Sequence, residues 1–180
     1  MAQTPIDIKA LIRTIADFPK PGVQFRDITT LLEDRDGFHE VIERFAQAYA
    51  DQTLDKVAAI ESRGFIIGAA LAYRLNVGFV PIRKHGKLPA ENFGCDYALE
   101  YGRDRLEMHR DAIARDERVL LVDDLIATGG TAEAAARLIR MGGGSVAGCA
   151  FVIDLPDLGG RRRLEALGYP VLSLCDFSGH

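Results

Sequence analysis

The sequence predicts an α/β fold, an open and mostly parallel twisted sheet flanked by helices, in a single domain spanning residues 1–180. From residue 56 onward, short apolar runs alternate with stretches of helical periodicity, which is typical of parallel strands joined by helical crossovers. The runs at 119–122 and 147–153 are apolar at nearly every position, as in central strands buried on both faces. A hydrophobic content of 48% in 180 residues is sufficient for one continuous core.

The first element is predicted to be a helix, because Ile8, Leu11, Ile12 and Ile15 fall on one face at helical spacing. This helix has to end before the FPKPG turn at 18–22, where two prolines remove backbone donors.

A second helix is predicted over residues 37–51, with Asp36 as its N-cap. Its apolar residues repeat with a period of about 3.6, and they are Phe38, Val41, Ile42, Phe45 and Tyr49.

The remaining elements follow from the alternation itself. Strands are predicted at 56–60, 77–82, 118–124, 145–154 and 170–174. Helices are predicted at 64–76, 131–142 and 158–168.

One connection is too long for a plain crossover, the stretch between the strands at 77–82 and 118–124. Residues 97–101 and 105–109 can pair as a hairpin across the GRD sequence at 102–104. We therefore expect residues 84–109 to form a flexible hairpin arm or lid.

Composition excludes several classes of protein. Charged residues make up 27% of the chain, the net charge is −4, and acids and bases are mixed along the length, which disfavours nucleic acid as a partner. No signal peptide or long apolar segment is evident, so we expect a cytoplasmic protein without a membrane partner. The three cysteines lack the spacing of a disulfide framework or a zinc site. Cys149 and Cys175 are expected in the core, and Cys95 as an exposed thiol.

The segment 119–139 carries the clearest chemistry: a buried strand, two acids, a Thr/Gly loop and an Ala-rich helix. A loop between a parallel strand and the N-terminus of the next helix forms an anion site from backbone N–H groups. Residues 128–131 are therefore expected to wrap a phosphate, since glycines allow close approach and threonine hydroxyls add donors.

The same segment limits the ligand. No lysine follows the glycines and no GxGxxG is present, so neither a triphosphatase loop nor a dinucleotide site is indicated. Two adjacent carboxylates, Asp123 and Asp124, would repel a phosphate but suit ribose hydroxyls or a magnesium ion. A sugar phosphorylated at its 5-position satisfies both ends of this site.

The strand, the VDD acids and the ATGGT loop resemble the phosphoribosyl pyrophosphate motif of the type I phosphoribosyltransferases. The resemblance extends over nearly the whole chain. In the same order, FPKPGVQFRDIT near the start, ESRGF at 61–65, IRKHGKLP at 82–89 and LEYG at 99–102 are similar to blocks of the adenine phosphoribosyltransferase family.

This resemblance implies a reaction in which phosphoribosyl pyrophosphate and adenine give AMP and pyrophosphate, with Mg²⁺ bound with the phosphoribosyl pyrophosphate. It implies that Asp123 and Asp124 hold the ribose hydroxyls, while the 5-phosphate lies against Ala127, Thr128, Gly129, Gly130 and Thr131. The pyrophosphate is expected to meet the loop that holds Ser62, together with the cations Arg63, Arg83, Lys84 and Lys87. The Glu61–Ser62 bond is one that is often cis in this family.

The resemblance also implies roles in catalysis and base recognition. Glu100 is implied as the acid/base residue near the purine, with Tyr101 beside the sugar phosphate. Phe25 and Leu155 are implied to cover the two faces of the base, and the backbone near Val23 and Gln24 to read its edge, with Arg26 nearby. The four histidines lack metal-ligand spacing, so no protein-bound metal is expected.

Alternatives remain at this stage. One is a phosphoribosyltransferase for a 6-oxopurine or orotate, although the loop has Ala127 where 6-oxopurine enzymes typically have aspartate. Another is a non-catalytic regulator that binds phosphoribosyl pyrophosphate, which would need a basic surface or an added DNA-binding domain. The family is commonly dimeric, so a homodimer is expected.

Overall fold

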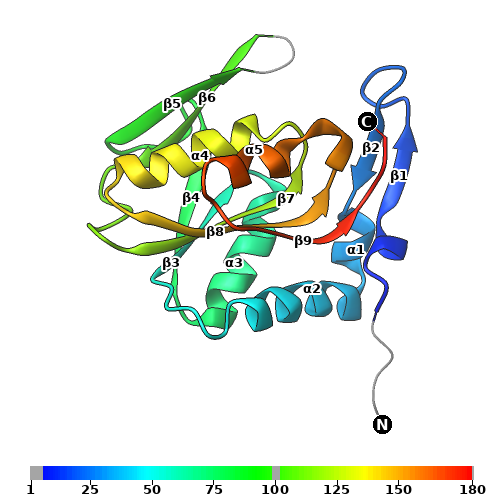
Figure 1. Cartoon of the computed structure of the whole chain (residues 1–180), viewed down its shortest axis with the longest axis horizontal. Coiled ribbons are helices and arrows are strands. Elements are labelled where there is room, and N and C mark those ends of the chain that lie inside the picture. Colours follow the sequence, from blue (N-terminus) through cyan, green and yellow to red (C-terminus); the bar gives the residue numbers. More distant parts are fainter. Residues whose placement is uncertain (1–5, 99–101, 180) are drawn as a thin grey trace.

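A computed structural model describes residues 6–98 and 102–179 and confirms the predicted fold class (Figure 1). Its main sheet has seven strands in the order β5-β6-β4-β3-β7-β8-β9. Five neighbours run parallel: β4 (Gly78–Lys84), β3 (Lys56–Ile60), β7 (Arg118–Ile126), β8 (Ser145–Asp154) and β9 (Val171–Asp176). At the β4 edge, β5 (Asn92–Ala98) and β6 (Arg103–His109) form an antiparallel hairpin.

Helices cover both faces of this sheet (Figure 1). One face carries α2 (Arg35–Ala48) and α3 (Arg63–Leu75), with the short α1 (Thr29–Glu33) beside them, and the other carries α4 (Gly130–Met141) and α5 (Gly160–Ala166). Alternate side chains of β7 pack into two separate hydrophobic cores. Leu120 and Val122 pack with α2 and α3, whereas Val119 and Leu121 pack with α4. The strand is therefore buried on both faces, as its unbroken apolar run predicts.

The predicted N-terminal helix is wrong. Residues Lys9–Leu11 form a single 3-10 turn (η1), and β1 (Arg13–Ala16) then pairs with β2 (Gln24–Asp27) in an antiparallel hairpin separate from the main sheet. Ile8 and Ile12 are buried as expected, but Ile15 lies on the hairpin and is 37% exposed. Cross-strand pairing with β2, a partner that local periodicity cannot show, overrides the helical spacing.

The N-cap of α2 is also two residues earlier than predicted. Asp34 has extended backbone and its carboxylate accepts a hydrogen bond from the Gly37 N–H at 2.7 Å, whereas Asp36 lies in the first turn. Both positions satisfy the preference for an acid at a helix start, and only the extended residue can cap.

The predicted hairpin is confirmed, but its turn is displaced. Ala98 pairs with Arg103, and Tyr97 with Asp104, so Arg103 and Asp104 lie in β6 and not in the turn. Cys149 is buried as predicted, and Cys95 and Cys175 are both half-buried. In the part of the chain that the structure describes, no helix is both long and apolar enough to cross a membrane.

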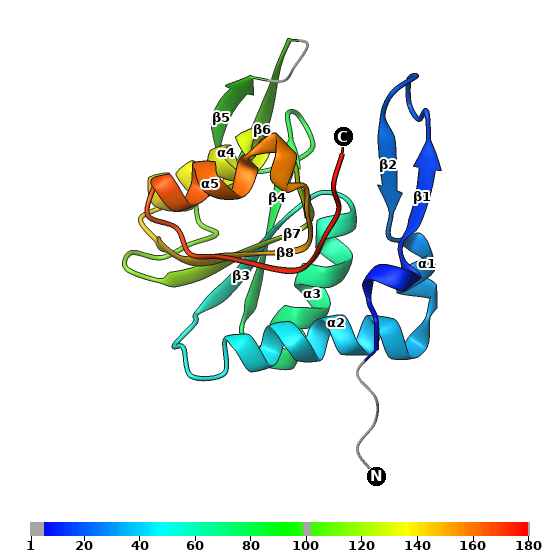
Figure 2. The same cartoon turned by 45° about the vertical axis from the view of Figure 1, so that its right-hand side comes forward.

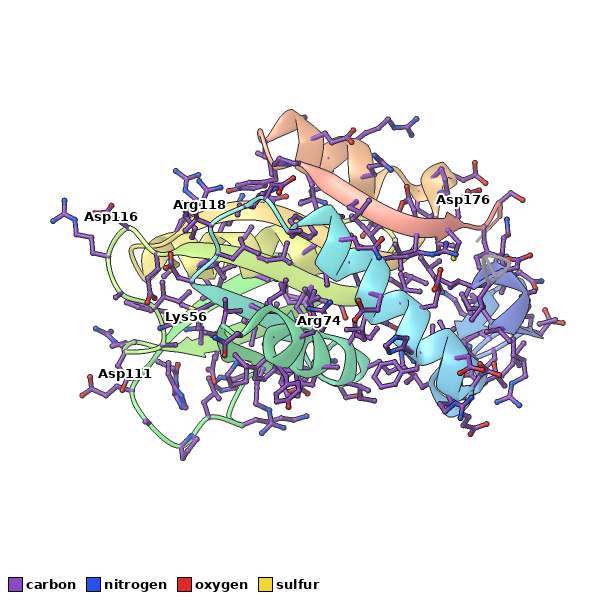
Figure 3. All side chains as sticks on the ribbon, turned by 90° about the horizontal axis from the view of Figure 1, so that it is seen from below. Lys56, Arg74, Asp111, Asp116, Arg118 and Asp176 are labelled. Atoms are coloured by element: carbon purple, nitrogen blue, oxygen red, sulfur yellow. The ribbon has the colours of Figure 1, made fainter. Side chains whose placement is uncertain are left out.

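The amino ends of the parallel strands are closed by charged groups of the chain itself. Lys56 and Arg118 lie at this end of neighbouring strands (Figure 3). Lys56 Nζ is 2.9 Å from the Glu117 carboxylate, and the Arg118 N–H donates to Asp55 at 2.7 Å. Ligand binding is therefore left to the opposite, carboxyl ends of the strands.

At the base of the β1–β2 hairpin, Asp27 is a buried carboxylate that ties the two strands to α1. It accepts hydrogen bonds from Arg13 Nε at 3.1 Å and from the Thr29 N–H at 3.0 Å. The Arg13 side chain, followed by the backbone N–H of Thr29, lowers the pKa of Asp27 from 3.8 to about 2.

Replacing Asp27 with Asn is expected to lower the free energy of unfolding by about 1–3 kcal/mol at neutral pH, because charged hydrogen bonds are lost at a buried site. Since the folded pKa lies below 3.8, the carboxylate stabilises fully above that pH and loses this effect as pH falls toward 2. Urea unfolding at pH 7 and near pH 3 measures both effects. The exposed Asp36→Asn serves as control, and an equal loss for Asp27→Asn at both pH values would contradict the assignment.

Candidate functional site

Two adjacent pockets open at the carboxyl ends of β3 and β7. The first has a volume of about 640 Å³ and the second about 470 Å³. Both are lined by Arg63, Leu125 and Ala127, so they meet at these three residues. We refer to them as the sugar-phosphate pocket and the base pocket, after the ligands that the sequence predicts for each.

The phosphate loop predicted at the end of β7 lies in the wall of the sugar-phosphate pocket. Ala127, Thr128, Gly129 and Thr131 line this pocket, and α4 begins at Gly130 with its N-terminus at the loop. Gly129 has φ +80°, a conformation that favours glycine. The loop therefore presents backbone N–H groups at a helix N-terminus, as an anion site requires.

The N-terminus of α5 supports this loop from behind. Gly160 donates its N–H to the Ala127 carbonyl at 2.9 Å. A Cβ atom at Gly160 would lie 2.3 Å from that carbonyl oxygen and 2.7 Å from the Gly129 nitrogen, so only glycine allows this approach. Glu133 of α4 also pairs with Arg163 of α5 at 2.5 Å, which ties the two helices together.

The two predicted acids lie side by side in the sugar-phosphate pocket, and both face it. Asp124 is buried and forms an ion pair with Arg63 of α3. The Asp123 carboxylate accepts the Asp124 N–H at 2.9 Å. Burial, and then the neighbouring Asp124 charge, raise the pKa of Asp123 well above its usual value. A bound cation or hydroxyl donors would offset this cost by compensating the negative charge.

Three of the four predicted cations line the sugar-phosphate pocket, and each is paired with one of its carboxylates. Arg63 pairs with Asp124, Lys84 with Asp104 at 3.2 Å, and Lys87 with Glu61 at 2.5 Å.

The fourth cation, Arg83, does not line this pocket. Its Nε donates to Glu61 at 3.1 Å and its Nη1 to the Lys87 carbonyl at 3.3 Å, so it supports the loop that carries Lys87. Ser62 lines the pocket, and the Glu61–Ser62 bond is cis, as the sequence resemblance implies.

The base pocket brings together every residue predicted for base recognition. Val23, Gln24, Phe25 and Arg26 come from β2 and the turn before it, and Leu155 follows β8 on the other side. No acid is among its lining residues within the described ranges 6–98 and 102–179.

Aromatic and cationic contacts fix the inner end of this pocket. The Phe25 ring contacts Phe18 edge-on, with centroids 5.2 Å apart, and the Arg63 guanidinium carbon lies 5.2 Å from the Phe25 centroid. Because Arg63 also pairs with Asp124, this one side chain connects the two pockets.

Sequence reasoning missed Tyr97 and Asp104, which line the sugar-phosphate pocket from the hairpin. The Tyr97 hydroxyl donates to Asp104 at 3.2 Å and also bonds with the Thr131 side chain of the phosphate loop. Burial raises the pKa of Tyr97, which keeps it a donor at neutral pH. Only the hairpin register, which pairs Tyr97 with Asp104, could have identified these residues beforehand. Glu100 and Tyr101 lie outside the described residues.

Comparisons with known proteins agree with this geometry. Residues 27–169 match the phosphoribosyl transferase domain family. The chain is 64% identical to an adenine phosphoribosyltransferase of Methylobacillus flagellatus, over 96% of this chain and 98% of that one. It superimposes on the crystal structure of adenine phosphoribosyltransferase from Thermoanaerobacter pseudethanolicus with a TM-score of 0.91, at 51% identity over 95% and 98% of the chains. The Saccharomyces cerevisiae enzyme, solved with an imino-altritol bisphosphate and adenine, gives 0.88 at 37% identity over 93% and 96%.

Replacing Gly160 with Ala is expected to weaken binding of ribose 5-phosphate by about 10- to 100-fold, because the added methyl group displaces the Ala127–Gly129 backbone. Titration calorimetry measures this affinity, and the midpoint of thermal unfolding is followed in parallel. The matched control is Gly78→Ala, whose Cβ would meet only the flexible Lys56 side chain at 3.4 Å. Wild-type affinity in a folded Gly160→Ala protein would show that the close approach does not shape the site.

Proposed function

The chain belongs to the phosphoribosyltransferase family, and we propose that it transfers the 5-phosphoribosyl group from phosphoribosyl pyrophosphate to adenine, giving AMP and pyrophosphate in purine salvage. The observation that supports this proposal is that the two pockets meet and share three lining residues, Arg63, Leu125 and Ala127. A sugar phosphate held by the loop of residues 127–131 has its C1 end directed toward the base pocket, where a purine can attack. Positioning the two reactants in this way supplies much of the rate enhancement.

Adenine fits the base pocket better than a 6-oxopurine does. Hypoxanthine and guanine carry a carbonyl and a protonated N1 where adenine has an amine donor and an N1 acceptor. Position 127 holds alanine, and no acid lines the described part of this pocket. We propose that the backbone near Val23 and Gln24 reads the adenine edge, between Phe25 and Leu155, with Arg26 behind them.

For the sugar phosphate, we propose that Asp123 and Asp124 bind the ribose hydroxyls and that residues 127–131 hold the 5-phosphate. We also propose that the pyrophosphate meets Ser62, Arg63, Lys84 and Lys87, which line this pocket. Arg83 supports these residues through its hydrogen bonds to Glu61 and the Lys87 carbonyl. Cations at this position stabilise the negative charge that develops on the leaving group.

Mg²⁺ is proposed to enter with the substrate. The described lining of the sugar-phosphate pocket has four acids (Glu61, Asp104, Asp123 and Asp124) against three bases (Arg63, Lys84 and Lys87), an excess of negative charge in a site for a polyanion. Carboxylate oxygens and phosphate oxygens together are the ligands Mg²⁺ prefers.

The hairpin of β5 and β6 is proposed to act as a lid over the reacting ribose. As the pyrophosphate leaves, the ribose gains positive charge at C1, and water has to be excluded from it. Tyr97 and Asp104 already contact the pocket from this hairpin. From the sequence resemblance, we propose that Glu100 exchanges a proton with the purine and that Tyr101 acts beside the sugar phosphate. We also propose a cytoplasmic location, which the three free cysteines support.

A homodimer is proposed through the outer face of α3. Ile66 and Tyr73 lie two turns apart on this helix and are 46% and 89% exposed. Phe79 of β4, which is 36% exposed, packs edge-on against Phe65 of the same helix, with ring centroids 5.7 Å apart. Aromatic residues of this kind are enriched at interfaces. Because α3 begins with Arg63, a second copy packed on this face would also restrain the helix that carries an active-site cation.

The assignment of substrate is tested by measuring kcat/KM for adenine, hypoxanthine and guanine with phosphoribosyl pyrophosphate and Mg²⁺. Adenine is expected to be favoured by at least about 10³-fold, because sites built on hydrogen bonds reject analogues with reversed donors and acceptors. Comparable values for adenine and hypoxanthine would exclude the adenine assignment and leave the phosphoribosyltransferase one standing.

The double variant Asp123→Asn with Asp124→Asn is expected to keep its fold and to lose at least about 10²-fold in kcat/KM for phosphoribosyl pyrophosphate, because charge-assisted hydrogen bonds to the ribose are lost. Steady-state kinetics measures the loss. Asp96→Asn, an exposed acid on the outside of the hairpin, is the control. A wild-type kcat/KM in the folded double variant would show that these two acids do not bind the ribose.

Replacing Tyr73 with Asp is expected to weaken the dimer by at least about 30-fold, because a charge replaces a central aromatic contact. Sedimentation velocity over a range of concentrations measures the dissociation constant. Met141→Asp places the same charge at a residue 49% exposed on the opposite helical layer and should leave the dimer intact. A Tyr73→Asp protein that stays dimeric would exclude this face.

A further inference from the structure

The base pocket has walls from two parts of the molecule that share no strand pairing. One wall is β2, whose pairing partner among the described residues is β1 alone. The other is formed by Leu125, Ala127, Leu155 and Leu158 of the α/β core. The width of this pocket therefore depends on contacts that hold the β1–β2 hairpin against the core.

The segment that follows β9 supplies such contacts. Residues 177–179, which we call the tail, leave the end of β9 and run beside β2 (Figures 1 and 2). The tail is anchored to the core at both ends: the Phe177 N–H donates to the Asp154 carbonyl at 3.0 Å, and the Gly179 N–H donates to the Asp157 carboxylate at 2.8 Å. Asp154 and Asp157 directly precede Leu155 and Leu158, so the anchors lie next to the core wall of the base pocket.

On its other side the tail contacts the β1–β2 hairpin through Arg26. The Arg26 Nη2 donates to the Ser178 carbonyl at 3.1 Å, and its guanidinium carbon lies 4.5 Å from the centre of the Phe177 ring. The Lys9 ammonium lies 4.9 Å from the centre of the same ring. Phe177 is thus in contact with two cations from the segment before β1 and from β2, a favourable arrangement for an aromatic face.

Through these contacts Arg26 holds in place the neighbouring residues that are proposed to recognise the base. Its Nη1 donates to Thr14 on β1 at 2.6 Å, so a single guanidinium connects both strands of the hairpin with the tail. Its Nε is buried and makes no hydrogen bond to the described residues, so the contacts to Thr14, Ser178 and Phe177 are what hold this side chain. Val23, Gln24 and Phe25 directly precede Arg26 in the chain and follow its position.

We propose that Phe177 is a positioning residue for the base: it holds Arg26, and through it β2, at the distance from Leu155 and Leu158 that a purine requires. Phe177 itself does not line the base pocket, so it acts only through its neighbours. The sugar-phosphate pocket shares Arg63, Leu125 and Ala127 with the base pocket, but its described lining includes no residue of the tail or of β2. Loss of the tail contacts therefore affects recognition of the base and leaves recognition of phosphoribosyl pyrophosphate intact. The identity of the base rests on the proposed function.

The test compares four full-length proteins in steady-state kinetics, with KM for adenine and KM for phosphoribosyl pyrophosphate determined separately. Phe177→Leu keeps an apolar side chain of similar size but removes the aromatic face. It is expected to raise KM for adenine by about 3- to 30-fold, the range for losing cation–π contacts, with KM for phosphoribosyl pyrophosphate within twofold of wild type. Phe177→Tyr keeps the ring and should restore the wild-type value. Leu167→Ala, an apolar residue 50% exposed after α5, is the control for a generic surface change.

An unchanged KM for adenine in Phe177→Leu would overturn the proposal. So would an equal rise in both KM values, because that pattern indicates a general loss of structure. Failure of Phe177→Tyr to restore the wild-type KM would overturn the role of the aromatic face. These outcomes are separate from failure of the proposed function, in which the wild-type protein itself would form no AMP from adenine.

Discussion

Helices on both faces of the sheet leave only the ends of its strands for polar chemistry. Along β7 successive side chains enter one core and then the other, and a charged group in either would lose its hydration without compensation. Asp123 and Asp124 lie near the carboxyl end of this strand, which ends at Ile126. The amino ends are already closed by the Lys56–Glu117 pair and its neighbours, so the acids, the phosphate loop and the hairpin converge at the opposite edge.

Charge compensation within the sugar-phosphate pocket explains how so many ionised groups coexist there. Arg63, Lys84 and Lys87 each form an ion pair with one carboxylate of the pocket. Among the described lining residues, Asp123 is the acid for which no ion pair with these three cations is formed. Burial, and then the charge of the neighbouring Asp124, raise the pKa of this carboxyl group well above its usual value. A polyanionic substrate that arrives with a divalent cation can exchange partners on both sides, with its phosphates taking the lysines and its cation facing the acids. Binding then rearranges existing ion pairs, which limits the desolvation cost of each charge.

The parts of the site that could be predicted from sequence are those made within one strand–loop–helix unit. Residues 123–131 need only the end of a buried strand and the start of a helix, and both are visible in local periodicity. Tyr97 and Asp104 could not be found this way, because they face the pocket only through the register of a hairpin whose turn was placed too late. The spacing of Ile8 to Ile15 predicts a helix where β1 forms for the same reason, because the partner strand β2 lies beyond a proline-rich turn. Gly160 carried no local signal at all, because its close neighbour Ala127 is 33 residues away in the chain.

Recognition of the base differs from recognition of the sugar phosphate in how it is assembled. The phosphate loop is held by hydrogen bonds of adjacent elements and by the approach of Gly160, so its geometry is fixed once β7, α4 and α5 have packed. The base pocket lies between a separate hairpin and the segment after β8, and the tail contacts this hairpin through Arg26. Hydrogen-bond discrimination between purines is sensitive to small displacements, since a donor moved away from its acceptor leaves a buried polar group unpaired. If the proposed function holds, base selectivity depends on the tertiary contacts around Arg26, whereas phosphate binding depends on the packing of β7, α4 and α5, and we expect that substitution can change the two independently.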